Sequence, residues 1–116
     1  MVIRWEALTI DARDPLSLAQ WWAETLGWRV TDPVPGGVEV QEPDGSAPSL
    51  FFVAVDDRKS AKNRLHLDLY AGDQGATLDD LLARGASRVS AGQPDEAEWT
   101  VLADPEGNEF CLLEPR

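Results

Sequence analysis

Residues 66–73 read His-Leu-Asp-Leu-Tyr-Ala-Gly-Asp, and this stretch decides the fold because an earlier segment repeats its pattern. Residues 7–14 read Ala-Leu-Thr-Ile-Asp-Ala-Arg-Asp, which alternates in the same way and also ends on aspartate. Alternation of apolar and polar side chains is typical of a strand with one buried face. A repeat of this kind indicates two copies of one unit. We therefore expect a single domain, residues 1–116, built from two units at about residues 1–57 and 62–115.

Both copies predict the same order of elements beyond these first strands. Asp14 followed by Pro15 is typical of a helix start, because an aspartate side chain caps the first turn and proline fits it. Apolar residues then recur at helical spacing up to Gly27, and a similar helix in the second copy ends at Gly85. Short strands are expected at residues 5–10, 28–31, 38–41, 50–55, 65–70, 87–90, 99–103 and 109–113. Each copy is therefore predicted to fold as β-α-β-β-β.

The chain carries 10 Lys and Arg against 21 Asp and Glu, which gives a formal net charge of −11. This excess of negative charge argues against nucleic acids and anionic membrane surfaces as partners, because both are polyanionic. The single cysteine permits no internal disulfide, and charged residues follow Met1 too closely for a signal peptide. No apolar run approaches the ~20 residues of a membrane-spanning helix. We therefore expect an acidic, soluble, cytoplasmic protein.

Strand alternation also assigns side chains to faces. The side chains expected under the helix of the second copy are Leu65, Leu67, Leu69, Phe110 and Leu112. Those expected on the opposite face are Arg64, His66, Asp68, Tyr70, Glu109, Cys111 and Leu113. In the first copy the opposite face is expected to hold Trp5, Ala7, Thr9 and Asp11. Two such sheets curved toward each other would form a cleft lined by these mixed and polar residues.

Two motifs carry a resemblance to a known family. The second copy opens on Leu65-His-Leu-Asp68 and closes on Asp104-Pro-Glu-Gly-Asn-Glu-Phe110. With two β-α-β-β-β units, they resemble the vicinal oxygen chelate superfamily of glyoxalase I, bleomycin-resistance proteins and extradiol dioxygenases. Further matching segments, similar to small glyoxalase-like proteins of actinobacteria, are 21–28, 62–69, 85–89 and 99–113. The resemblance implies an α+β fold of two tandem modules forming a curved mixed sheet around a cleft, and it implies a homodimer.

Metal-dependent members of this superfamily place one ligand on the first and one on the last strand of each unit. Carried onto this sequence, the first position falls on Ala7 and the second within residues 50–55, which contain no ligand side chain. The third falls on His66 and the fourth on Cys111. Two donors, one of which must lose a proton, hold a divalent ion weakly. We therefore expect no metal cofactor, with a divalent metal at His66 as the alternative.

The remaining candidates concern ligand contact. His66 is the only histidine and the best candidate for a catalytic base, and Arg64 and Asp68 either orient it or form an ion-pair row without chemistry. Cys111 is expected to be a small, partly buried residue and not a nucleophile, because a neighbouring carboxylate, that of Glu109, raises the pKa of a thiol. The ligand-binding candidates are Trp5, Thr9, Arg64, His66, Asp68, Trp99, Glu109 and Cys111.

Aromatic and basic residues leave two interpretations open. Trp5 and Trp99 begin strands, where flat rings either stack on a planar ligand or complete the core. Trp21 lies off the apolar stripe of the first helix, which points to an edge or a subunit contact. Arg58, Lys59 and Lys62 lie in the polar link between the copies, where they are either solvated or in contact with a phosphate or carboxylate.

We expect a metal-free glyoxalase-like protein that binds a small planar or cationic molecule in its cleft. The alternative is a metal-dependent lyase, isomerase or dioxygenase of the same superfamily that uses His66 as a ligand. A third possibility is a partner-binding domain with no small ligand, although the polar face of the predicted sheet disfavours it.

Overall fold

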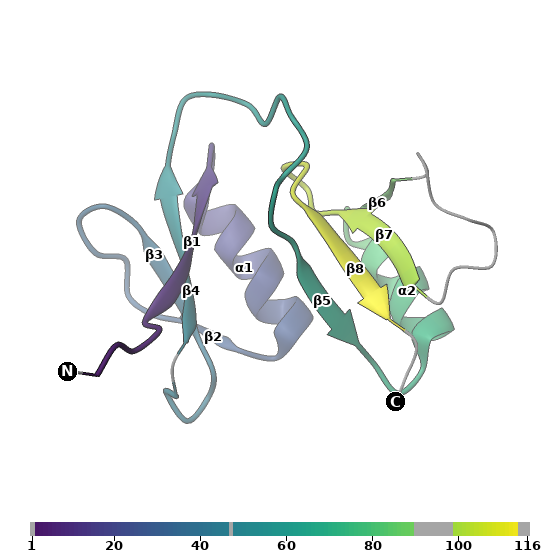
Figure 1. The fold of residues 1–116 in the computed structure, drawn as a ribbon, viewed down its shortest axis with the longest axis horizontal. Helices are drawn as coiled ribbons and strands as arrows, with labels where there is room; N and C mark the ends of the chain where they lie inside the picture. The colour runs from purple at the N-terminus through teal and green to yellow at the C-terminus, as the bar shows by residue number, and fades with distance from the viewer. Residues whose placement is uncertain (1, 47, 90–98, 114–116) are drawn as a thin grey trace. The chain divides into compact units, whose positions relative to one another are not determined.

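The structure, a computed structural model, describes residues 2–46, 48–89 and 99–113. The chain divides into two compact units, Met1–Arg58 and Lys59–Arg116 (Figure 1). No helix in the described ranges is both long and apolar enough to cross a membrane.

The first unit contains one helix and a four-stranded sheet. Its elements are β1 (Ala7–Ala12), α1 (Pro15–Leu26), β2 (Arg29–Val30), β3 (Val38–Gln41) and β4 (Ser49–Ala54). The strand order is β1-β4-β3-β2, with β1 parallel to β4 and the other neighbours antiparallel. The parallel pair follows from the topology, because α1 and two further strands lie between β1 and β4 in the chain.

The helix of the first unit begins and ends where the sequence predicts. The Asp14 carboxylate accepts a hydrogen bond from the backbone N–H of Ser17 at 3.2 Å, and Pro15 is the first helical residue. Gly27 ends the helix with a φ of 70°, a left-handed conformation that favours glycine. Trp21, expected at an edge or a subunit contact, is instead buried, with its ring 5.1 Å from that of Trp22 in an edge-to-face arrangement.

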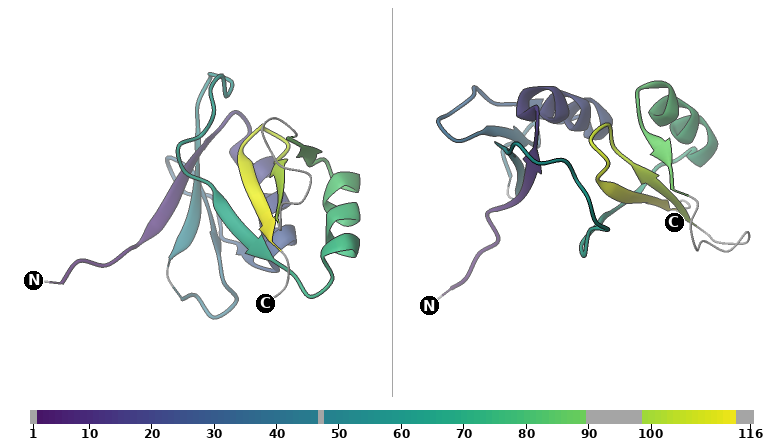
Figure 2. Two further views of the ribbon diagram at one scale, coloured as in Figure 1. Left: turned by 45° about the vertical axis from the view of Figure 1, so that its right-hand side comes forward. Right: turned by 90° about the horizontal axis from the view of Figure 1, so that it is seen from above.

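The second unit repeats this architecture. Its elements are β5 (Leu67–Tyr70), α2 (Gln74–Ala83), β6 (Ser87–Arg88), β7 (Trp99–Ala103) and β8 (Glu109–Leu113). The strand order is β5-β8-β7-β6, again with the first and last strands parallel, and α2 lies on one face of the sheet (Figure 2). Asp73 caps α2 by accepting from the backbone N–H of Ala76 at 3.0 Å. The largest fully buried side chains in its core are Leu81, Leu102, Phe110 and Leu112.

The α+β prediction of two tandem β-α-β-β-β modules is confirmed. The strands expected at 99–103 and 109–113 are found with those bounds. The strand expected at 65–70 begins only at Leu67, and Leu65, expected under the helix, is 76% exposed, so that placement is wrong. The alternating pattern extends beyond the residues that pair with β8, and without a paired neighbour Leu65 is not held against the core.

Candidate functional site

The candidate side chains gather on the side of the second unit's sheet that faces away from its core, which we call the open face. In β8, Phe110 and Leu112 are each 1% exposed and belong to the core. Because side chains alternate along a strand, Glu109, Cys111 and Leu113 point to the open face. The sequence pattern therefore assigned the residues of β8 to their faces correctly.

The register of the sheet arranges the open face in rows, because residues paired on neighbouring strands point to the same side. Cys111 is paired with Asp68 of β5 and with Val101 of β7. Leu113 is paired with Tyr70 and with Trp99 on the same two strands. These two rows place residues side by side that lie tens of positions apart in the chain.

His66, Asp68 and Cys111 form a polar cluster on this face. The Nδ1 atom of His66 lies 3.0 Å from Oδ1 of Asp68, and the two side chains are 48% and 52% exposed. Cys111 is buried beside them, and the donor atoms of all three residues lie within 4.8 Å of one another. The carboxylate of Asp68 thus connects an exposed imidazole to a buried thiol.

The thiol of Cys111 is held in its protonated form. Burial raises the pKa of Cys111, and the negative charge of Asp68 and a hydrogen bond with that carboxylate raise the pKa further. Glu109, the carboxylate that the sequence predicted to have this effect, contributes less than Asp68. A protonated, buried thiol is a poor nucleophile and a poor metal ligand, since both roles need the thiolate.

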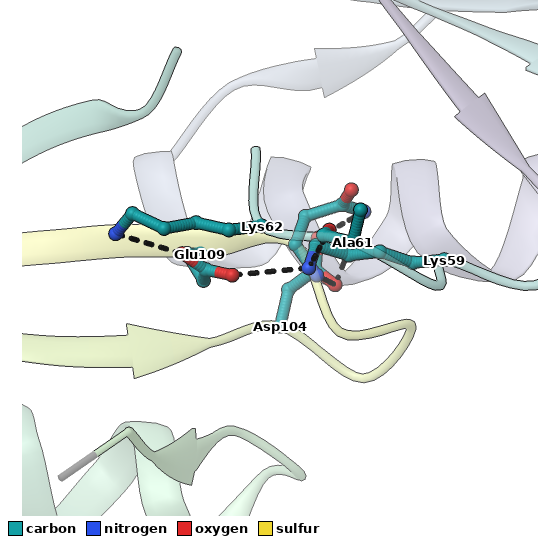
Figure 3. Close-up of polar contacts among 6 residues, drawn as sticks. Lys59, Ala61, Lys62, Asp104 and Glu109 are labelled. Carbon is teal, nitrogen blue, oxygen red and sulfur yellow. Dashed lines mark hydrogen bonds and ion pairs between the residues drawn. The ribbon is translucent and has the colours of Figure 1, made fainter. Parts of the chain in front are cut away.

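Glu109 is held by two lysines that approach it from opposite sides (Figure 3). Lys59 Nζ lies 3.0 Å from Glu109 Oε1, and Lys62 Nζ lies 3.5 Å from Oε2. The hydrogen bond from Lys59 lowers the pKa of Glu109 against the opposing effect of burial, and the charges of both lysines lower the pKa further. Lys59 therefore contacts a carboxylate of the chain itself, whereas Lys62, with its side chain 81% exposed, is largely solvated and also reaches Glu109.

The turn before β8 fixes the position of Glu109. Asp104 is 2% exposed, and its Oδ1 accepts hydrogen bonds from the backbone N–H groups of Glu106 at 2.9 Å and Asn108 at 3.0 Å. The side-chain Nδ2 of Asn108 donates to Oδ2 of Asp104 at 3.0 Å. Gly107 has a φ of 91°, which favours glycine, and its N–H donates to the Asp104 carbonyl. The Asp-Pro-Glu-Gly-Asn motif is therefore a structural device that positions the start of β8.

The remaining candidates are Arg64, Trp5, Thr9 and Trp99. Arg64 is exposed and precedes β5. Trp5 precedes β1, is 66% exposed and donates from Nε1 to the carbonyl of Ala7 at 3.2 Å. Thr9 is an exposed residue of β1, and both residues belong to the first unit. Trp99 is 42% exposed and shares its row with Tyr70, 65% exposed, which the sequence placed on this face but did not select as a candidate.

The cluster does not fit a metal ion of the kind that the family resemblance implies. The position on β1 is Ala7, and β4 reads Ser-Leu-Phe-Phe-Val-Ala, with no strong ligand. In the second unit, burial and the charge of Asp68 raise the pKa of the Cys111 thiol, which disfavours the thiolate that a metal ion needs. What these residues can do chemically is present a half-exposed carboxylate and an imidazole to a ligand.

Comparison with known proteins gives the same assignment of the fold. A family model described as a glyoxalase-like domain matches residues 7–113. No curated protein matches the sequence.

Several solved structures share the fold over nearly the whole chain. One is a glyoxalase/bleomycin resistance protein/dioxygenase family enzyme from Burkholderia phytofirmans, at 18% identity and a TM-score of 0.71, covering 94% of this chain and 96% of that one. Another is TnmS3, an antibiotic binding protein from a Streptomyces species, at 21% identity and a TM-score of 0.67. The match covers 99% of this chain and 98% of that one. A member of the glyoxalase/bleomycin resistance protein/dioxygenase superfamily from Sphaerobacter thermophilus has 22% identity and a TM-score of 0.67, with 98% of each chain covered. The chain therefore belongs to the glyoxalase-like domain family.

Proposed function

We propose that this chain is a metal-free binding protein for a small planar or cationic molecule, which it holds on the open face of the second unit. The observation that carries the proposal is the His66–Asp68 pair, with its 3.0 Å contact and side chains about half exposed. A carboxylate in that setting is bonded on one side yet accessible to a ligand. His66 is the best candidate for any proton transfer, because it is the one imidazole of the chain and lies on this face.

The hydrogen bonding within the cluster favours the metal-free form. A metal ion at these residues would need the thiolate of Cys111, whose pKa is raised by burial and by Asp68. A ligand that accepts from the imidazole or donates to the carboxylate does not need this deprotonation.

A solved structure of the same fold offers a parallel. The Streptomyces protein that this chain resembles at 21% identity is an antibiotic binding protein. One fold supports many activities, so the parallel supports small-molecule binding and does not identify the ligand.

One observation favours a metal-dependent enzyme as a second candidate. The donor atoms of His66, Asp68 and Cys111 all lie within 4.8 Å of one another, so small side-chain movements would bring them around one ion. Nitrogen, oxygen and sulfur donors together suit zinc or nickel better than magnesium. In this alternative a lyase, isomerase or dioxygenase reaction would use His66 as a metal ligand.

Titration of the purified chain separates the two candidates. We expect proflavine, a planar cation, to raise the melting temperature, and 2-naphthoate, a planar anion, to have a smaller effect. Nickel, zinc and manganese should leave both the melting temperature and the tryptophan fluorescence unchanged. Stoichiometric metal that is lost in His66→Ala would contradict the metal-free proposal and support the enzyme instead.

A matched pair of variants localises the site. Asp68→Asn should abolish most of the stabilisation by proflavine, whereas Asp79→Asn, which removes an exposed carboxylate from α2, should not. Equal effects of the two variants would show that proflavine responds only to net charge, and the site proposed on the open face would then be wrong.

We also propose that residues 1–116 work as one domain and as a homodimer in the cytoplasm. Light scattering should give twice the mass of the chain, and thermal unfolding should show a single transition. A mass of one chain at micromolar concentration would contradict the homodimer. Two separate unfolding transitions would contradict the single domain.

A further inference from the structure

The open face changes character along the strands of the second unit. Asp68 and Cys111 lie opposite each other, with His66 bonded to Asp68. Two residues further along β5 and β8, the paired residues are Tyr70 and Leu113. A polar end is therefore followed directly by an apolar, aromatic end.

The aromatic end is a cross-strand row in which Leu113 lies between Tyr70 and Trp99. Both aromatic side chains present ring surface to solvent, with Tyr70 65% and Trp99 42% exposed. The two outer strands of the row lie ~10 Å apart, since neighbouring strands are separated by ~4.8 Å. A ring stacked on both sides needs about 7 Å between the planes of the rings around it. The row can therefore hold a planar ring system above Leu113.

The polar end offers the carboxylate of Asp68, whose ion-pair contact in the described part of the chain is with a histidine and not with a lysine. Glu109 is held by Lys59 and Lys62, whereas the contact of Asp68 is with Nδ1 of His66. The side chain of Asp68 remains 52% exposed beside this contact and is therefore accessible to a ligand. The net charge of −11 adds a general attraction for cations. This end of the open face therefore favours a ligand cation over a ligand anion.

The two ends lie at a spacing that a single small molecule can bridge. Asp68 and Tyr70 are two residues apart in β5, and a strand rises ~3.3 Å per residue, so their side chains are offset by about 6.6 Å. An ammonium group joined to an aromatic ring by a chain of two or three carbons covers this length.

We propose that the open face binds an arylalkylamine, with its ring over Leu113 between Tyr70 and Trp99 and its ammonium group on Asp68. The inference rests on the proposed small-molecule function and narrows it from planar or cationic ligands to ligands that carry both features. Neither end alone accounts for this class, because the ring needs the aromatic row and the ammonium needs the carboxylate.

A matched series of four compounds tests the class by calorimetric titration of the whole chain. Tryptamine has both ring and ammonium, 3-ethylindole only the ring, butylamine only the ammonium, and indole-3-propionate has a carboxylate in place of the ammonium. Tryptamine should bind at least about fivefold more tightly than each of the others. Equal binding of 3-ethylindole, or tighter binding of indole-3-propionate, would overturn the proposal.

Variants assign the two ends separately. Asp68→Asn should weaken the binding of tryptamine about fivefold and leave the binding of 3-ethylindole unchanged, because only the charged contact is lost. Tyr70→Ala should weaken the binding of both compounds by a similar factor, because both contain the ring. Asp79→Asn is the control for net charge and should change neither affinity. Loss of tryptamine binding to the same extent in all three variants would contradict the geometry.

The outcome for proflavine distinguishes this inference from the function on which it rests. If proflavine binds and depends on Asp68 while the indole series shows no preference for tryptamine, the arylalkylamine class is wrong and the proposed function stands. If neither proflavine nor any compound of the series binds, both are wrong.

Discussion

Lys59 Nζ lies 3.0 Å from Glu109 Oε1, a contact that joins residues 50 positions apart in the chain. The two side chains are only 21% and 14% exposed, so the pair is partly shielded from water. Lys62 also reaches Glu109, but its side chain is 81% exposed and its distance is longer. The segment at the start of the second unit is thereby fastened to the first residue of β8.

Glu109→Gln should lower the free energy of unfolding by about 1 kcal/mol, because it removes the charge of a partly buried ion pair. Urea denaturation of the variant beside the wild type measures the change. Lys62→Met is the matched comparison and should change stability by less than about 0.5 kcal/mol, since exposed ion pairs contribute little. A larger effect of Lys62→Met than of Glu109→Gln would contradict this ranking.

The stability that Glu109 contributes should depend on pH in a defined direction. The hydrogen bond from Lys59 lowers the pKa of Glu109 from its ordinary value of 4.5 in the folded protein. A group with a lowered folded pKa stabilises the protein above its unfolded pKa, and this stabilisation is lost as the pH falls through the folded pKa. Denaturation of wild type and Glu109→Gln from about pH 7 down to about pH 3 should show their difference shrinking at the acid end. A difference that grows on acidification would contradict the assignment.

Cys111 should react slowly with iodoacetamide near neutral pH. Burial is the first cause of its raised pKa, and the charge of Asp68 is the second. Asp68→Asn should therefore accelerate alkylation by a few fold while leaving it slower than that of a free thiol. The rate is followed by mass spectrometry as a function of pH. Alkylation of the wild type at the rate of free cysteine would show that the thiol is accessible and that its pKa is not raised.

Asp104→Ala should destabilise the chain by about 2 to 3 kcal/mol, because it leaves buried backbone donors without an acceptor. The carboxylate that is removed accepts from the N–H groups of Glu106 and Asn108 and is 2% exposed. Asp104→Asn retains one oxygen that can accept a hydrogen bond, so it should lower the free energy of unfolding by less. Thermal and urea denaturation measure both variants, and equal losses for Ala and Asn would mean that the negative charge of the carboxylate, and not the oxygen that Asn retains, sets the effect.

Local patterns in the sequence determined the elements of this protein. Asp14 and Gly27 bound α1 because capping depends on a few neighbouring residues. Alternation assigned Phe110 to the core and Cys111 to the open face because the two faces of a strand follow directly from its period of two. The same pattern wrongly predicted that Leu65 is a buried strand residue, because the alternation extends to Leu65 whereas β5 begins at Leu67.

The tertiary structure decided which of these residues meet. Register pairs Asp68 with Cys111 and sets Tyr70 in one row with Trp99, and it depends on how the strands align after the intervening helix and turns. Lys59 and Lys62 contact Glu109 because long, flexible side chains reach a residue that only folding brings near. Periodicity reports the face that a side chain occupies, whereas the partner on that face is set by contacts between residues far apart in the chain.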